Sequence, residues 1–217
     1  MLCTEAIKIT GGLSAPSKVG AGYSIPASCC ITGTRLRKVE GSVCRKCYAH
    51  NRNRYAFPSV KAAMDYRYHA LSNPAWVAAM VRQIKGKAYF RWHDSGDLQS
   101  VQHLKNIVEV CRQTPETKHW LPTKEWGGLE KGKWAKKIVE RWQEKGGKIP
   151  PNLVIRKAMY FLDQDPPDDL PGAYCAVATQ RSRVTCPSTL KKGTNCEQNN
   201  CRKCWNPKVR LVRYREH

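Results

Sequence analysis

The chain has 217 residues, of which 41% are hydrophobic, and 38 Lys or Arg against 17 Asp or Glu give it a formal net charge of +21. This composition is typical of a globular domain and excludes a disordered chain, and no apolar run is long enough to span a membrane. The first residues lack a basic segment followed by an apolar one, so we expect a cytoplasmic protein without a secretory signal. The positive charge predicts nucleic acid as a partner, and the lack of a long apolar run predicts no association with membranes.

The cysteines are the second unusual feature, since the chain holds 11 of them. In a reducing compartment this number favours metal ligation over a disulfide framework. Most of them lie in two sets near the chain ends. The N-terminal set is Cys29, Cys30, Cys44 and Cys47, and the C-terminal set is Cys186, Cys196, Cys201 and Cys204. Basic residues gather around both sets, where they could hold an anion beside a metal centre.

The N-terminal set contains a C-x2-C turn, Cys44 to Cys47, which brings two thiolates to one metal. With Cys30 as a third ligand, a [4Fe–4S] cluster would keep one iron open for a substrate or second cofactor. A zinc knuckle completed by Cys3, Cys29 or His50 is the alternative, because a structural zinc site needs four ligands. The spacing leaves zinc against iron–sulfur open, and also Cys29 against Cys30.

The middle of the chain alternates between predicted helices and strands. A helix is expected from Asn73-Pro74 to Gly86, and another carries Val101, Leu104, Val108 and Cys111 on one face. Trp134, Ile138 and Trp142 predict a third helix, which Gly146-Gly147 ends. Strands are expected at 88–92, at 118–121 before Pro122, at 153–156 and at 174–179.

Strands that recur at the spacing of a βαβ unit predict a parallel sheet covered by helices. Because a complete (β/α)8 barrel typically needs about 250 residues, we expect an α/β fold with a truncated TIM-type barrel or an open sheet. The acidic, proline-rich segment 164–172 predicts a boundary. Residues 1–172 would form the partial barrel with its N-terminal cluster loop, and 173–217 a cysteine-rich extension packed on it.

Functional residues of such folds lie at the carboxyl ends of the strands. This placement makes His93, Asp94 and Asp97 the candidate catalytic residues. Ser95, Gly96, Asp97 and Arg156 are the candidate cofactor-binding residues. Structural roles are the alternatives: a helix cap for Asp97, a hydrogen-bonded strand end for His93 and an ordinary strand-end charge for Arg156.

The C-terminal set reads C-x9-C-x4-C-x2-C within turn-forming sequence. So little apolar sequence separates these cysteines that the segment would need a metal to fold. The irregular spacing, with proline after Cys186, favours a second [4Fe–4S] cluster, and zinc is the alternative. Cys111 is expected in the core, and Cys175 in the core or as a spare ligand.

Several motifs together resemble one family. They are Cys30-x13-Cys44-x2-Cys47-Tyr48-Ala49, residues 11–18, residues 90–98 and the cysteines of the tail. In this order they are similar to the "gene product eighty-eight" family of cysteine-rich bacteriophage proteins, which resemble radical-SAM iron–sulfur proteins. The resemblance implies a [4Fe–4S] cluster, S-adenosylmethionine held near Ser95, Gly96 and Asp97, and a location in the host cytoplasm. The long first spacer departs from the usual C-x3-C-x2-C motif.

Three functions are compatible with these observations. The first is a radical-SAM-like enzyme that acts on a nucleic-acid component. The second is a non-catalytic nucleic-acid-binding protein stabilised by iron–sulfur clusters or zinc, and the third is an electron carrier. The sequence identifies neither the substrate nor the oligomeric state.

Overall fold

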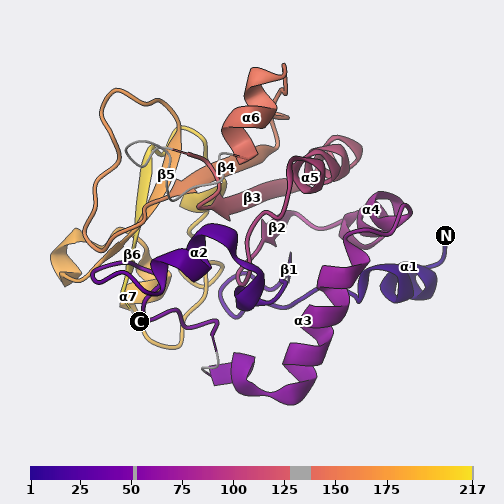
Figure 1. Ribbon diagram of the computed structural model, residues 1–217, viewed down its shortest axis with the longest axis horizontal. Coiled ribbons are helices and arrows are strands. Elements are labelled where there is room, and N and C mark those ends of the chain that lie inside the picture. The colour runs from indigo at the N-terminus through magenta and orange to yellow at the C-terminus, as the bar shows by residue number, and fades with distance from the viewer. Residues whose placement is uncertain (51–52, 128–137, 217) are drawn as a thin grey trace.

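The computed structural model describes residues 1–50, 53–127 and 138–216 (Figure 1). The strands are β1 (Gly22–Tyr23), β2 (Tyr89–Trp92), β3 (Lys118–Thr123), β4 (Leu153–Ala158), β5 (Ala173–Ala178) and β6 (Leu211–Arg215). The α-helices are α1 (Cys3–Thr10), α2 (Ile31–Leu36), α3 (Pro58–Ala70), α4 (Trp76–Ile84), α5 (Val101–Gln113), α6 (Ile138–Glu144) and α7 (Pro187–Leu190). Short 3-10 helices are η1 (Ala27–Cys29), η2 (Asn53–Ala56), η4 (Arg181–Arg183) and η5 (Lys203–Trp205).

The six strands form one sheet in which every neighbouring pair is parallel. Their order in the sheet, β1 to β6, is their order along the chain, so each connection leads to the adjacent strand. β1 and β6 are the two edges, and in the described part of the chain the sheet does not close. The α/β class and the parallel sheet are therefore confirmed, as an open sheet.

The two faces of the sheet have different surroundings because side chains alternate along each strand. On β2, Phe90 and Trp92 face a hydrophobic core shared with α4, α5 and α6, which lie on that side (Figure 1). Arg91, between them, faces the opposite side, where its guanidinium lies over the ring of Trp120 from β3. Helices thus bury one face, and the loops and C-terminal segment cover the other.

Most predicted elements are present, with shifted ends. The strand predicted to stop before Pro122 continues to Thr123, and Pro122 is paired in register with Arg156 of β4. A proline ring can lie inside a parallel strand where its missing N–H faces no acceptor. The prediction missed α1, α2, α3 and α7 and the two edge strands β1 and β6. Trp134, expected on the helix that includes α6, lies outside the described residues.

The boundary expected at residue 172 falls between β4 and β5, which pair in the same sheet. β6 extends that sheet further by pairing with β5 along its whole length. Both strands of the cysteine-rich segment 173–217 are thus part of the sheet. Within the ranges that the structure describes, no helix combines the length and apolarity needed to cross a membrane.

The loop after β2 packs tightly on β1 at one glycine. Gly96 has φ +80°, and a Cβ on it would lie 2.9 Å from the carbonyl oxygen of Ile25 and would overlap that side chain. The Ile25 amide in turn donates to the Ser95 carbonyl at 3.2 Å. The glycine therefore permits this close approach of two loops.

We predict that Gly96→Ala destabilises the protein by about 2 to 5 kcal/mol, the sum of a left-handed backbone and overpacking. Gly86→Ala is the matched control, because Gly86 has φ +85° but nothing within 4 Å of its would-be Cβ. It should cost only the backbone part, about 1 to 2 kcal/mol. Denaturant unfolding of both variants measures the difference, and equal losses would contradict the packing described here.

His119 of β3 gives a second prediction. It is fully buried, stacked on Trp92, and its pKa is lowered by burial to about 4. The Thr114 hydroxyl donates to the Val110 carbonyl, so the His119 Nε2–H donates to the Thr114 oxygen at 2.9 Å. The imidazole is therefore neutral in the folded protein.

Because the unfolded chain binds a proton at His119 from about pH 6.5, stability falls as the pH drops from there to about 4. This loss amounts to about 3 kcal/mol for His119 alone. His119→Gln should reduce the slope of unfolding free energy against pH across that window, while the buried His93 and His103 continue to contribute to it. An unchanged slope between pH 6.5 and 4 would show that the imidazole does not titrate as described.

Candidate functional site

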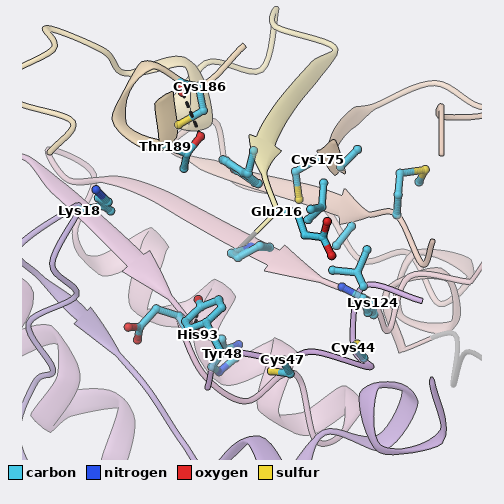
Figure 2. A pocket seen from close by; sticks show the side chains of 18 of the residues that line it. Lys18, Cys44, Cys47, Tyr48, His93, Lys124, Cys175, Cys186, Thr189 and Glu216 are labelled. Carbon is cyan, nitrogen blue, oxygen red and sulfur yellow. Dashed lines mark hydrogen bonds between the residues drawn. The ribbon is translucent and has the colours of Figure 1, made fainter. Parts of the chain in front are cut away.

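A pocket of about 570 Å³ lies on the sheet face opposite α4, α5 and α6. Its walls include Arg91, Trp120, Cys175 and Tyr214 from strands β2, β3, β5 and β6. Both cysteine sets contribute as well. Figure 2 shows Cys44 and Cys47 at one side of the pocket, Cys186 at another and Cys175 between them. Two segments far apart in sequence thus meet at one cavity.

The three predicted N-terminal ligands approach one another after β1. Cys30 precedes the first turn of α2, and the C-x2-C turn is closed by the Cys47 amide, which donates to the Cys44 carbonyl at 3.3 Å. A Cβ on Gly33 would lie 3.6 Å from the Cys44 sulfur and 3.7 Å from the Cys30 sulfur. The two sulfurs therefore flank one point, which only a glycine leaves open.

The electrostatic neighbours distinguish Cys30 from Cys29. The pKa of the Cys30 thiol is raised well above its usual value by burial and then by the charges of Asp97, Cys44 and Cys47. For Cys29, burial and the charge of Asp65 raise the pKa, and the other cysteines do not contribute. Of these two adjacent cysteines, Cys30 is the one that faces Cys44 and Cys47.

Lys124, directly after β3, supplies positive charge at this site. Burial raises the pKa of the Cys44 thiol and Lys124 partly opposes that effect. Burial would lower the pKa of Lys124 itself, but the charges of Cys44, Cys175, Asp97 and Cys30 together outweigh it and raise the value. The ammonium is thus placed to balance thiolates, and sequence reasoning missed it because one lysine among many carries no local signal.

Asp97 connects the loops after β2 and β3. One carboxylate oxygen accepts hydrogen bonds from the Leu98 amide at 2.7 Å and the Thr123 hydroxyl at 2.5 Å. The other accepts from the Lys124 amide at 2.8 Å. Burial, followed by the charge of Glu125, raises the pKa of Asp97 to about 7. Asp97 is therefore a buried acid at the pocket wall that can exist in either protonation state near neutrality.

Ser95 and Gly96 precede this aspartate. The Ser95 hydroxyl is buried and has no hydrogen-bond partner in the described part of the chain, while its carbonyl accepts from the Ile25 amide. Gly96 lines the pocket, whereas Ser95 does not. Only Gly96 and Asp97 of this stretch are thus placed to contact a ligand.

His93 and Asp94 occupy different environments although they are adjacent. His93 lines the pocket with φ 52°, is 3% exposed, and neither ring nitrogen has a partner among the described residues. Burial and the neighbouring His103 lower its pKa well below the usual value, so the ring is neutral. His93 therefore keeps two unsatisfied nitrogens beside the cavity.

Asp94, in contrast, is fully engaged. Its carboxylate accepts from the Ser24 hydroxyl, from Arg54 at 2.6 Å and from the Tyr55 hydroxyl at 2.6 Å, and its carbonyl accepts from Tyr48 at 2.7 Å. These contacts fix the segment that follows the N-terminal cysteines onto the end of β2. Asp94 is a positioning residue in this arrangement.

The C-terminal cysteines lie in a small core with Trp120, Trp205 and Val212. Cys186, Cys196 and Cys204 are buried there, and Cys201 is half-buried. The charges of Cys186 and Cys201 act on Cys196, and that of Cys186 acts on Cys204, whose pKa burial raises to about 12. The structure therefore brings all four predicted ligands into one neighbourhood.

Two contacts tie this loop to the rest of the chain. The Cys196 amide donates to the Lys18 carbonyl at 3.0 Å, and the Lys18 ammonium donates to the Thr194 carbonyl at 2.8 Å. The Trp205 indole donates to the Phe90 carbonyl of β2 at 3.0 Å. The C-terminal set is thus held against the sheet by backbone and side-chain hydrogen bonds.

Arg156 takes a structural position. It is fully buried, and its guanidinium nitrogens donate to five backbone carbonyls at 2.5 to 3.0 Å. The acceptors belong to Tyr174, Lys203, Cys204, Asn206 and Val209. Because its donors are occupied, Arg156 anchors the cysteine-bearing η5 turn to β4 instead of contacting a ligand in the pocket.

The cysteines are gathered but do not form a tight coordination shell. Across residues 1–50, 53–127 and 138–216, no group of three or more His, Cys, Asp or Glu side chains is arranged to hold a single metal ion.

Sequence reasoning also did not single out Arg91 and Tyr214 as pocket residues. Arg91 is in register with Trp120 on the neighbouring strand β3, which could have indicated it, whereas Tyr214 lies on β6, which was not predicted.

We predict that Arg156→Gln lowers the free energy of unfolding by at least about 3 kcal/mol, because several buried carbonyls lose their donor. Arg210→Gln is the control, since Arg210 also donates to carbonyls, those of Pro167 and Leu170, but at the surface. It should cost less than about 1 kcal/mol. Similar losses for the two variants in denaturant unfolding would contradict an anchoring role of Arg156.

The family model described as "Gene product 88" matches residues 4–207, a span that includes both cysteine sets and the strands from β1 to β5. No curated protein and no solved structure matches the chain. The match confirms the resemblance to this phage family that the motifs indicated, and it does not extend to the radical-SAM proteins. The chain belongs to the gene product 88 family.

Proposed function

We propose that this protein is an iron–sulfur enzyme of the radical-SAM type that acts on a nucleic-acid component. The observation that supports it best is the convergence of Cys30, Cys44 and Cys47 beside a pocket that covers one face of the parallel sheet and reaches the carboxyl ends of its strands. Ligands of α/β folds bind outside the carboxyl ends of the strands. The open sheet, with strands in sequential order, also fits a partial barrel.

The donor set fits a four-iron cluster better than a zinc ion. A cluster is larger than a single ion, so its cysteine sulfurs stand farther apart than those around tetrahedral zinc. The open point between the Cys30 and Cys44 sulfurs at Gly33 agrees with the larger group. Three cysteines also leave one iron without a protein ligand.

The surrounding residues suit this chemistry. When bound, such a cluster supplies the electron for reductive cleavage of S-adenosylmethionine. Lys124 would balance the negative charge of the thiolates, and Asp97 could accept a hydrogen bond from the ammonium group of the methionine moiety. The neutral His93 faces the cavity and could accept or return a proton.

The C-terminal cysteines would hold a second cluster, with zinc as the alternative. Cys186, Cys196 and Cys204 line the same pocket as Cys44 and Cys47, so a second centre there would lie across the cavity from the first. Cys175 lies between the two sets on β5 and its charge acts on Cys204, so it could replace one of them. Arg156 would fix Cys204 in either case.

A second candidate function is non-catalytic binding of nucleic acid, with the metal centres as structural supports. The net charge of +21 favours it. A binding protein should keep a salt-dependent affinity for DNA or RNA after Cys44 is replaced, whereas the enzyme hypothesis also requires a product. An electron carrier, the third alternative, would be reduced reversibly without turnover.

The test is anaerobic reconstitution of wild type and Cys44→Ala, with Cys3→Ala as the control because Cys3 is exposed at the N-terminus. The wild type should bind iron and acid-labile sulfide and form 5′-deoxyadenosine from S-adenosylmethionine under a strong reductant. Cys44→Ala should lose the N-terminal centre and the product, since two cysteines hold a cluster poorly. Cys3→Ala should behave as the wild type.

Two results would contradict the proposal. Equal iron and sulfide in the wild type and Cys44→Ala would remove the N-terminal site. A fully loaded wild type that forms no deoxyadenosine would remove the radical-SAM activity while leaving an iron–sulfur protein.

A further inference from the structure

Arg91 of β2 is a cation that the proposed chemistry does not use. It lines the pocket, and its guanidinium carbon lies 4.6 Å from the centre of the Trp120 ring. The same group hydrogen-bonds the Tyr48 hydroxyl, and its Nε is buried without a hydrogen-bond partner among the described residues. Arg91 is thus held in one place while part of its donor capacity stays unused.

The neighbouring carboxylates do not neutralise this charge. In the described part of the chain Arg91 makes no ion pair. Asp94, the acid whose charge acts on it most, already accepts from Ser24, Arg54 and Tyr55. A buried guanidinium without a carboxylate is costly, so the cavity beside it favours an anion.

The charge of the whole pocket points the same way. Six cationic side chains line it against four carboxylates: Lys18, Arg45, Lys46, Arg54, Arg91 and Lys124 against Glu40, Asp94, Asp97 and Glu216. Two of the acids are held in ion pairs, Asp94 with Arg54 at 2.6 Å and Glu216 with Lys46 at 3.7 Å. Lys124 faces the cysteines, and the Lys18 ammonium donates to the Thr194 carbonyl. Arg91 is the cation that a strand contributes, on the sheet face of the cavity, and Arg45 also lines the cavity.

The chemistry around Arg91 selects the kind of anion. The planar guanidinium suits a phosphate, which it can bind with two parallel hydrogen bonds. The tyrosines Tyr48, Tyr55 and Tyr214 and the ring of Trp120 also line the pocket, and such rings pack against nucleobases. A volume of about 570 Å³ is within the range of small-molecule sites.

We propose that the pocket binds a nucleotide, with its phosphate on Arg91 and its base among these aromatic rings. The proposal rests on the proposed function in so far as it names the nucleic-acid component as a phosphorylated nucleoside. It does not require a cluster, because Arg91 and its neighbours belong to β2, β3 and the segment after Cys47. Trp120 and Tyr48 orient the guanidinium, and the phosphate completes its hydrogen bonds.

The test is calorimetric titration of the purified protein with adenosine 5′-monophosphate, adenosine, inorganic phosphate and S-adenosylmethionine. The variants are Arg91→Gln, Arg91→Lys and, as the matched control, Arg82→Gln, which removes the same charge from the exposed face of α4. The monophosphate should bind the wild type and Arg82→Gln equally. Arg91→Gln should weaken it about tenfold or more, the effect of one charged hydrogen-bonding group.

Adenosine should bind more weakly than the monophosphate, and its affinity should be the same for wild type and Arg91→Gln. If Arg91→Gln does not fold, Arg91→Lys is used instead. Lysine keeps the charge but lacks the paired donors of the guanidinium, so the affinity for the monophosphate should still fall several-fold. Equal binding to wild type and to the folded Arg91 variant overturns the proposal. The proposal is also overturned if S-adenosylmethionine or inorganic phosphate binds and adenosine 5′-monophosphate does not, since the pocket would then recognise a ligand other than a nucleotide.

Titration of Cys44→Ala separates this inference from the proposed function. Nucleotide binding that survives in this variant supports the Arg91 site even where deoxyadenosine is never formed. Loss of nucleotide binding in a folded Cys44→Ala would instead mean that the ligand sits on the cysteine side of the cavity, against the placement proposed here.

Discussion

All six strands run in the same direction and lie in the order in which the chain forms them, and the remaining features depend on this constraint. Every loop that leaves a strand therefore emerges at the same side of the sheet, the one formed by the carboxyl ends of the strands. The loops after β1, β2 and β3 therefore carry Cys30, Asp97 and Lys124 into one neighbourhood. The final strand β6 brings the end of the chain back to the same sheet, and the C-terminal cysteines come with it.

Buried polar groups hold this arrangement together. Arg156 joins β4 to the segment Lys203–Val209 through four carbonyls and to β5 through the Tyr174 carbonyl, and Asp94 joins β2 to the segment after the N-terminal cysteines. Glu125, after β3, accepts from the Thr32 amide at the start of α2 at 2.8 Å. Groups of this kind are costly to bury unless they are hydrogen-bonded, so each fixes one segment in one position.

Regular spacing of apolar residues predicted much of the fold. It could not predict which strands pair when those strands lie far apart in the sequence. The apolar residues Leu104, Val108 and Cys111 predicted α5 because they recur at the spacing of one helix face, which can be read from nearby positions in the sequence. β1 has only two residues, Gly22 and Tyr23, and its existence depends on pairing with β2. Asp97 was found from its place after a strand, whereas the anchoring role of Arg156 depends on carbonyls far along the chain, which no local pattern contains.

We propose above all that cysteines from the N-terminal and the C-terminal set lie around one pocket and there bind iron and sulfide. Anomalous diffraction at the iron absorption edge, from crystals of anaerobically purified protein, tests it most directly. The account predicts an iron peak between Cys30, Cys44 and Cys47, with further metal density near Cys186 and Cys204. A zinc peak among the N-terminal cysteines, or no metal there in protein handled without oxygen, would contradict it.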